Sequence, residues 1–322
     1  DALGRPTFID SVTAANAKEG EDITLTLDAS LQFSAELELR NAVMKHGAKG
    51  GSVIVMDAAT GEILAMANEP GFNANLRQNK GNRRNRAVTD GFEPGSTMKP
   101  LILATALNNG YKLTDKIHGE QGSFVVQGRK ISEAEAHERF EWISLKQMIQ
   151  VSSNVAAAKL ALKLGSDQVY TGLKTLGFGS RSGLGFPGEI VGLMPQRKAW
   201  QPLTLANIGF GQGILTTPIQ MIRAYASIAN GGWMIQPSLI KNASPEASPV
   251  APRRIFSEKT SDSVTEALLA VTDTRRDRSE STPGWLSCRT KNWNGSDGGL
   301  RYRTLFKISL LCFIYRISCG DS

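Results

Sequence analysis

Residues 92–100 read Phe92-Glu-Pro-Gly-Ser-Thr-Met-Lys-Pro100 and stand between a polar stretch and an apolar one. The Pro-Gly pair followed by an apolar run predicts that a loop ends here and that a helix extends from Ser96 to Leu107. The three-residue spacing of Ser96 and Lys99 places a hydroxyl and an amine on one face of that helix. Its N-terminus offers free backbone N–H groups and a partial positive charge. The sequence therefore predicts that polar chemistry is carried where this helix begins.

The reactivity of Ser96 depends on whether Lys99 can act as its base. A serine hydroxyl is a poor nucleophile until a base removes its proton, and a lysine serves only when it is neutral. Burial beside other cationic groups would lower the pKa of Lys99, and the backbone N–H of Ser96 could bind a developing oxyanion. The alternative is that Ser-x-x-Lys arises by chance, as it does in most chains of this length, and that Ser96 only caps the helix.

A second polar motif, Ser152-Ser-Asn154, lies 56 residues after Ser96 and precedes another predicted helix. Serine and asparagine are ordinary capping residues in such a place. The functional interpretation is that the Ser152 hydroxyl relays a proton to a leaving amine while the Asn154 amide holds a peptide carbonyl. Neither motif is specific alone, but the pair in this order and spacing, with Glu93-Pro-Gly95 in front of the first serine, is much more informative.

The remaining pattern predicts a mixed α/β chain. Ser52–Asp57 and Glu62–Ala67 form a predicted hairpin whose first strand is apolar enough to be central in a sheet. Alternation predicts a further strand at Asp22–Asp28, and Ser30 is expected to cap a helix that ends near His46. Further helices are predicted at 144–150, 153–164 and 218–230, and a Pro-rich linker at 244–252.

These motifs together resemble the transpeptidase domain of class B penicillin-binding proteins, with the division-type (septal) branch closer than the elongation branch. The resemblance covers roughly Asp22 to Thr274. Besides the two motifs, the resemblance includes the predicted hairpin over residues 51–67 and the sequence Ile208-Gly-Phe-Gly-Gln-Gly-Ile-Leu-Thr-Thr-Pro218. It implies an α/β fold of the penicillin-binding transpeptidase (serine β-lactamase-like) type, with an antiparallel sheet packed between helices and an all-helical subdomain.

The same resemblance implies the chemistry. Ser96 would attack the D-Ala-D-Ala bond of a peptidoglycan stem peptide, with Lys99 as general base, Ser152 as proton relay and Asn154 as the group that orients the substrate. An amine from a neighbouring stem peptide would then resolve the acyl-enzyme, and β-lactams would acylate the same serine. No metal or other cofactor is expected. The family implies a membrane anchor upstream, a place at the periplasmic face of the bacterial inner membrane and, in the full-length form, division proteins of that membrane as partners.

The third motif of the family, Lys-Thr-Gly, does not occur after Asn154, where the nearest sequence is Lys291-Asn-Trp-Asn-Gly295. If the gene is read in a frame that starts at the second base of the Lys291 codon, the codons of this stretch can encode Lys-Thr-Gly-Thr. The same shift of frame allows the codons of Arg275-Arg-Asp277 to encode Gly-Gly-Thr, which the family usually shows at this place. We therefore interpret residues 1–28 as the remnant of a non-catalytic module, 29–274 as an incomplete transpeptidase domain and 275–322 as a frameshifted C-terminal segment. The lost segment would supply a strand, an oxyanion N–H and a cation, so we expect impaired activity.

Charge and cysteines fit this division. The 48 residues of the C-terminal segment carry nine Lys and Arg against four Asp and Glu, which is +5 of the formal +7, and they hold all three cysteines. Because the rest of the chain is nearly neutral, no nucleic-acid partner is expected. His46, His118 and His137 lack metal-ligand spacing, and Gly183-Leu-Gly-Phe-Pro-Gly188 lacks the strand that a dinucleotide site needs.

Two alternatives of different function stay open. A β-lactam hydrolase or a β-lactam sensor of the same fold would share the serine–lysine pair, and rapid deacylation or a fused signalling segment would distinguish it. A non-catalytic remnant that binds division partners is suggested by the missing Lys-Thr-Gly.

Overall fold

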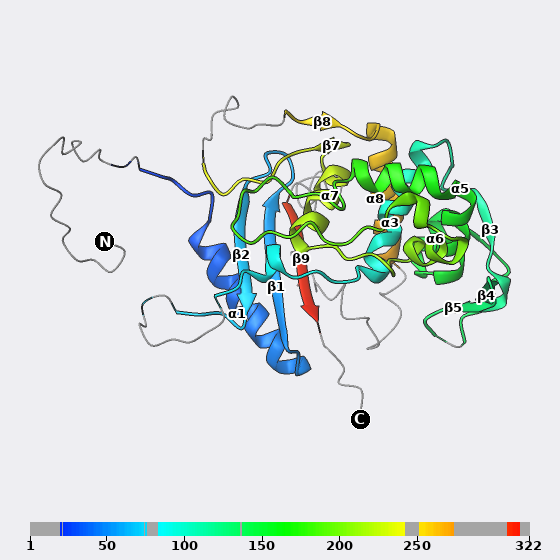
Figure 1. Cartoon of the computed structure of the whole chain (residues 1–322), viewed down its shortest axis with the longest axis horizontal. Coiled ribbons are helices and arrows are strands. Elements are labelled where there is room, and N and C mark those ends of the chain that lie inside the picture. The colour runs from blue at the N-terminus through cyan, green and yellow to red at the C-terminus, as the bar shows by residue number, and fades with distance from the viewer. Residues whose placement is uncertain are drawn as a thin grey trace, which may run out of the picture.

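The computed structural model describes residues 20, 22–73, 75, 83–135, 137–241 and 251–273, together with the backbone of the strand 308–315. Within these residues a three-stranded antiparallel sheet and a cluster of helices lie side by side (Figure 1). The order of the sheet is β2-β1-β9. Its strands are β1 (Gly50–Asp57), β2 (Ile63–Glu69) and β9 (Ile308–Tyr315).

The predicted hairpin is confirmed, since β1 and β2 pair antiparallel from Gly51↔Glu69 to Met56↔Ile63. The turn between them includes Gly61 at φ +80°, a backbone conformation that glycine adopts without strain. Strand β1 is buried along nearly its whole length and lies between two partners, as its apolar sequence predicted.

Two helices cover the two faces of this sheet. On one face, α1 (Ala29–His46) packs Ala35 and Leu39 against Val53 and Val55 of β1. On the other face, α7 (Pro218–Ala229) packs its apolar residues against the alternate side chains of β1, in a cluster that contains Ile54, Met56, Ile219 and Ile222. The alternation of side chains along β1 is thus used on both faces, which makes the sheet the middle layer of this part of the molecule.

The second part of the molecule is a helical cluster that shares one hydrophobic core. It consists of α3 (Lys99–Asn108), α4 (Leu145–Gln150), α5 (Asn154–Thr175), α6 (Pro202–Gly209) and α8 (Glu258–Asp273). This subdomain was predicted to be all helical, but it also carries two small sheets, β3 (Lys116–His118) with β6 (Trp142–Ser144) and β4 (Ser123–Val126) with β5 (Arg129–Ser132). In Figure 1 they lie at the end of the molecule opposite α1. The shorter elements are α2 (Arg86–Thr89), η1 (Gly95–Met98), η2 (Glu120–Gly122), η3 (Arg197–Ala199), β7 (Trp233–Met234) and β8 (Arg253–Arg254).

The N-terminal part differs from the prediction in two places. The predicted strand Asp22–Asp28 is wrong, since only Leu25 forms an isolated bridge, to Ile240. The reason is that the backbone of this segment forms hydrogen bonds with two different segments and not with one neighbouring strand. Asp28 N–H donates to Leu64 O, whereas Thr26 N–H donates to Leu239 O. The expected cap of α1 is also displaced, because the Asp28 carboxylate accepts from Ser30 N and Leu31 N.

Most of the predicted flanking segments lie outside the described residues. This applies to residues 1–19 of the predicted N-terminal remnant, to nearly all of the linker 244–252, and to 275–307 and 316–322 of the C-terminal segment. The backbone of β9, which belongs to the C-terminal segment, pairs with β1 from Gly50↔Tyr315 to Asp57↔Ile308.

Candidate active site

The loop before α3 holds Ser96 through contacts with the segment after α6 and with α7. Gly95 N–H donates to Gly211 O at 2.9 Å, and the Thr97 hydroxyl donates to Pro94 O at 2.6 Å. From α7 the hydroxyl of the partly buried Tyr225 donates to Thr97 O at 2.7 Å. Ser96 is therefore fixed from both sides, in a short 3-10 turn that continues directly into α3.

Lys99 is almost completely buried, with a relative exposure of 1%. Its Nζ lies 3.0 Å from Ser96 Oγ and 3.1 Å from Ser152 Oγ, so one amine contacts both predicted hydroxyls. It also donates to Ser152 O at 2.5 Å and to Asn154 Oδ1 at 2.7 Å. The structure thus brings all four predicted site residues together, with Ser96, Ser152 and Asn154 around the Nζ of Lys99.

Burial lowers the pKa of Lys99 from its ordinary value of 10.5 to about 7. The negative charges of Glu133 and Glu138 oppose this shift by stabilising the protonated amine. A lysine with such a pKa is neutral in a large part of the molecules near neutral pH, as a base must be.

Ser152 lies in the turn that connects α4 to α5. Its φ of +56° is in the left-handed region, which is uncommon for a residue with a side chain. Ser153 then caps α5, because its hydroxyl accepts from Ala156 N at 3.0 Å. The capping role and the contact with Lys99 are thus divided between neighbouring residues, with Ser153 as the cap and Ser152 facing the amine.

Glu133 belongs to the site although no sequence motif indicated it. Its carboxylate accepts from the Ser153 hydroxyl at 2.5 Å and from Asn154 N–H at 2.6 Å. Ser132 O, one residue earlier, accepts from Asn154 Nδ2 at 3.1 Å. The end of β5 therefore contacts both the backbone and the side chain of Asn154.

A cavity of about 440 Å³ opens next to Asn154, between β5 and α6. It begins where the cluster around Lys99 ends and offers polar and positively charged groups to a ligand. Its lining consists of Arg129, Lys130, Ile131, Ser132, Asn154, Leu203, Asn207, Phe210 and Gln212.

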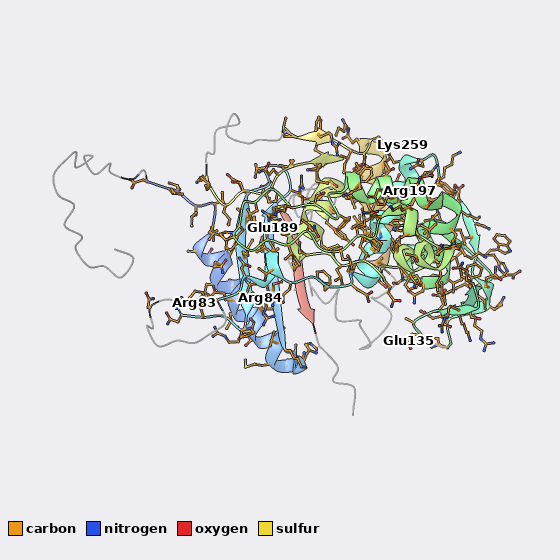
Figure 2. The ribbon with its side chains drawn as sticks, in the orientation of Figure 1. Arg83, Arg84, Glu135, Glu189, Arg197 and Lys259 are labelled. Carbon is orange, nitrogen blue, oxygen red and sulfur yellow. The ribbon has the colours of Figure 1, made fainter. Side chains whose placement is uncertain are left out.

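The basic sequence Arg83-Arg-Asn-Arg86 has acidic and aromatic partners in the structure. Asp90 lies 2.7 Å from Arg84 and 2.9 Å from Arg86, and the guanidinium of Arg83 lies over the Phe72 ring. Figure 2 labels Arg83 and Arg84 near the sheet, far from Glu135 at the β5 end of the molecule. Much of the positive charge of this loop is therefore compensated locally.

Among the residues that the structure describes, no three side chains of His, Cys, Asp or Glu gather as a metal site would require. Over the same residues, no helix is both long and apolar enough to cross a membrane.

Residues 51–286 match the family described as the penicillin binding protein transpeptidase domain, and the chain belongs to this family. It is 38% identical over 272 residues to a probable peptidoglycan D,D-transpeptidase PenA of Neisseria meningitidis, over 82% of this chain and 45% of that protein. It is 35% identical over 260 residues to the peptidoglycan D,D-transpeptidase FtsI of Escherichia coli, over 80% of this chain and 42% of that protein. The chain thus spans less than half the length of these two relatives.

Solved structures show the same fold. The transpeptidase domain of penicillin-binding protein 3 from Burkholderia pseudomallei superposes with a TM-score of 0.68 at 30% identity, over 77% of this chain and 70% of that chain. A structure described as a peptidoglycan glycosyltransferase from Burkholderia ambifaria gives a TM-score of 0.69, also at 30% identity, over 77% and 74% of the two chains. The predicted family, the class B penicillin-binding proteins of division type, and the predicted fold are therefore confirmed.

The contact between Gly95 and Gly211 gives a first prediction. A Cβ on Gly211 would lie 2.0 Å from Gly95 O, and Gly211 has a φ of +83°. We therefore expect Gly211→Ala to push the Ser96 loop away from Gly211, to destabilise the protein by about 1–3 kcal/mol and to slow any acylation of Ser96.

Gly213→Ala is the matched control for this prediction. Gly213 has a similar φ of +74°, but a Cβ there would meet no atom within 4 Å, so the control retains the strain without the clash. Thermal unfolding compares the two variants, and equal melting temperatures would contradict the expected clash.

Proposed function

We propose that this chain is the transpeptidase domain of a peptidoglycan D,D-transpeptidase of division type, which cross-links stem peptides through an acyl-enzyme on Ser96. The observation that carries the proposal is the buried Lys99 amine, 3.0 Å from Ser96 Oγ and 3.1 Å from Ser152 Oγ. An amine in this position can take a proton from one hydroxyl and stay in contact with the other.

In the first half of the reaction, neutral Lys99 accepts the proton of Ser96 as Ser96 Oγ attacks the carbonyl carbon of the D-Ala-D-Ala bond. The N–H of Ser96 stabilises the oxyanion in this proposal. Ser152 Oγ then passes a proton to the leaving nitrogen, so that D-Ala departs as a neutral amine and Lys99 supplies the proton that Ser152 gave up. In the second half the amine of another stem peptide attacks the ester, and its proton returns through the same groups to Ser96 Oγ.

Asn154 has two tasks in this proposal. Its Oδ1 accepts from Lys99 at 2.7 Å, which holds the amine between the two hydroxyls. Its side chain also lines the cavity next to the site, where it orients the substrate. The basic lining residues Arg129 and Lys130 favour an anionic part of the stem peptide in this cavity.

We further propose that the chain is impaired, because its 322 residues contain no Lys-Thr-Gly after Asn154. The family match ends at residue 286, before Lys291, where the other reading frame permits this motif. For the longer protein we propose an anchor in the bacterial inner membrane, a domain at its periplasmic face and division proteins of that membrane as partners.

The test is covalent labelling with a penicillin, followed by intact-protein mass spectrometry. We expect slow addition of one penicillin per chain and no addition to Ser96→Ala, because that variant lacks the attacking oxygen. An adduct that persists in Ser96→Ala would contradict the role of Ser96. Fast loss of the adduct would favour a β-lactam hydrolase, and a folded chain that forms no adduct would favour a non-catalytic remnant.

The pKa of Lys99 gives a prediction for the pH dependence of this labelling. Below about pH 7 the amine is protonated and cannot accept the proton of Ser96. The rate should therefore fall about tenfold for each pH unit below about 7 and level off above it. Adduct formation measured between about pH 5.5 and about pH 8.5 tests this, and a rate that is independent of pH would exclude Lys99 as the base.

A further inference from the structure

We propose that Glu133 is a positioning residue, whose carboxylate holds the N-terminal turn of α5 so that Ser152 and Asn154 stay in contact with Lys99. The inference rests on the proposed function, because it concerns the same site. Glu133 is 8% exposed and directly follows strand β5 of the β4–β5 hairpin, so it belongs to neither of the helices that flank the serine–asparagine motif. Its neighbour Glu135 marks this end of the molecule in Figure 2.

The hydrogen bonds of Glu133 favour its ionised form and hold its carboxylate in one orientation. Ser153 Oγ accepts from Ala156 N, so its own proton is donated to Glu133 Oε1. Glu133 Oε2 accepts from Asn154 N–H. Both oxygens thus act as acceptors, as in an ionised carboxylate, and the positive end of the α5 dipole favours the same form. Burial raises the pKa of Glu133, and these bonds together with the charge of Lys99 oppose that rise.

The turn that Glu133 holds needs such support. Ser152 has a left-handed φ of +56°, a conformation that persists in a residue with a side chain only when its surroundings impose it. This conformation places Ser152 O and Ser152 Oγ within hydrogen-bonding distance of Lys99 Nζ. On its own side Glu133 is anchored by its N–H, which donates to Gly122 O at 3.1 Å. The hairpin therefore acts as a fixed support for the turn.

A comparison with Glu138 distinguishes the effect of the negative charge of Glu133 from the effect of its hydrogen bonds. Both carboxylates stabilise the protonated form of Lys99 through space. Of these two glutamates, Glu133 is the one that accepts hydrogen bonds from Ser153 and Asn154. Glu133→Gln is nearly isosteric, but it removes the charge and presents an NH₂ group to one of the two donors. Glu138→Gln removes a charge and leaves the turn intact, so it is the matched control.

The experiment uses the full chain labelled with ¹⁵N and with ¹³C-lysine, so that its main readout does not depend on turnover. The Lys99 signal is identified by its loss in Lys99→Arg. We expect both Gln variants to lower the pKa of Lys99, because each removes a negative charge. Only Glu133→Gln should also shift the Asn154 amide proton upfield and speed its hydrogen exchange about tenfold or more, because that N–H loses a carboxylate acceptor.

Acylation by penicillin is the second readout. We expect Glu133→Gln to slow it about tenfold or more above the pKa of Lys99, and Glu138→Gln to leave it nearly unchanged there. If Glu133→Gln does not fold, Ser153→Ala replaces it. This variant retains the charge and removes the bond from Ser153 to Glu133 together with the cap bond from Ala156 N–H; it should move the Asn154 amide in the same direction by less.

Two outcomes would overturn the inference: an Asn154 amide that is unaffected by these variants, or equal effects of Glu133→Gln and Glu138→Gln on that amide and on acylation. Absence of acylation in every variant and in the unmodified chain would contradict the proposed function instead, and the amide measurement would still decide the role of Glu133.

Discussion

Lys99→Met is expected to slow the acylation of Ser96 by a penicillin about 10²- to 10⁴-fold. Methionine has a similar length and no amine, so Ser96 would lose the base that lies 3.0 Å from its hydroxyl. The variant should remain folded, because Lys99 is 1% exposed and an apolar side chain is favoured in such a place. The rate is measured by intact-protein mass spectrometry over several hours, with circular dichroism to establish that the variant is folded.

Lys163→Met is the matched control for this variant. Lys163 lies on α5 with an exposed side chain, so its replacement removes a positive charge without altering the buried cluster. We expect it to react at the rate of the unmodified chain. If Lys99→Met reacted as fast as Lys163→Met, the base would have to be another group, and the contacts around Lys99 would have only a structural role.

The features that could be predicted from the sequence are mainly local ones. The contact between Ser96 and Lys99 follows from their spacing at a helix start, and the hairpin follows from two apolar strands with a short turn. The contact with Ser152 and Asn154 depends on the packing of α3 against α5, and it was accessible only through the resemblance to a known family. Spacing fixes a contact within a helix but not one between two helices.

The features that escaped prediction depend on tertiary structure. Glu133 contributes through hydrogen bonds to a helix that begins 21 residues later, and no sequence pattern distinguishes it from its acidic neighbours. Three helices, the short α2 and the longer α6 and α8, were also missed. Helix α6 lies between glycine-rich stretches and has only eight residues, which is too short for a clear periodicity. The strand predicted at residues 22–28 failed for the opposite reason, since its alternation is clear but its backbone bonds are divided between two segments.

We propose that a frameshift after Thr274 replaced the C-terminal segment, and the largest gain is expected from restoring the other reading frame. In the proposed mechanism one oxyanion donor is Ser96 N–H, and we propose that the strand with Lys-Thr-Gly implied by the resemblance would supply a second donor and a substrate-binding cation. Loss of one oxyanion donor typically slows acyl transfer about 10²- to 10³-fold. The restored chain should therefore form the penicillin adduct faster by about that factor, because the attack on the carbonyl is limited by the missing charge stabilisation.

The comparison needs three proteins with the same first 274 residues: the present chain, the chain restored from the parent DNA, and the restored chain with Ser96→Ala. Equal acylation rates in the first two would mean that the C-terminal segment already supplies equivalent groups, and the proposed impairment would be wrong. A restored chain that gains rate only when Ser96 is present would show that the gain acts through acylation of Ser96. In that case the impairment would lie in transition-state stabilisation and not in the nucleophile, because the groups that activate Ser96 do not come from the exchanged segment.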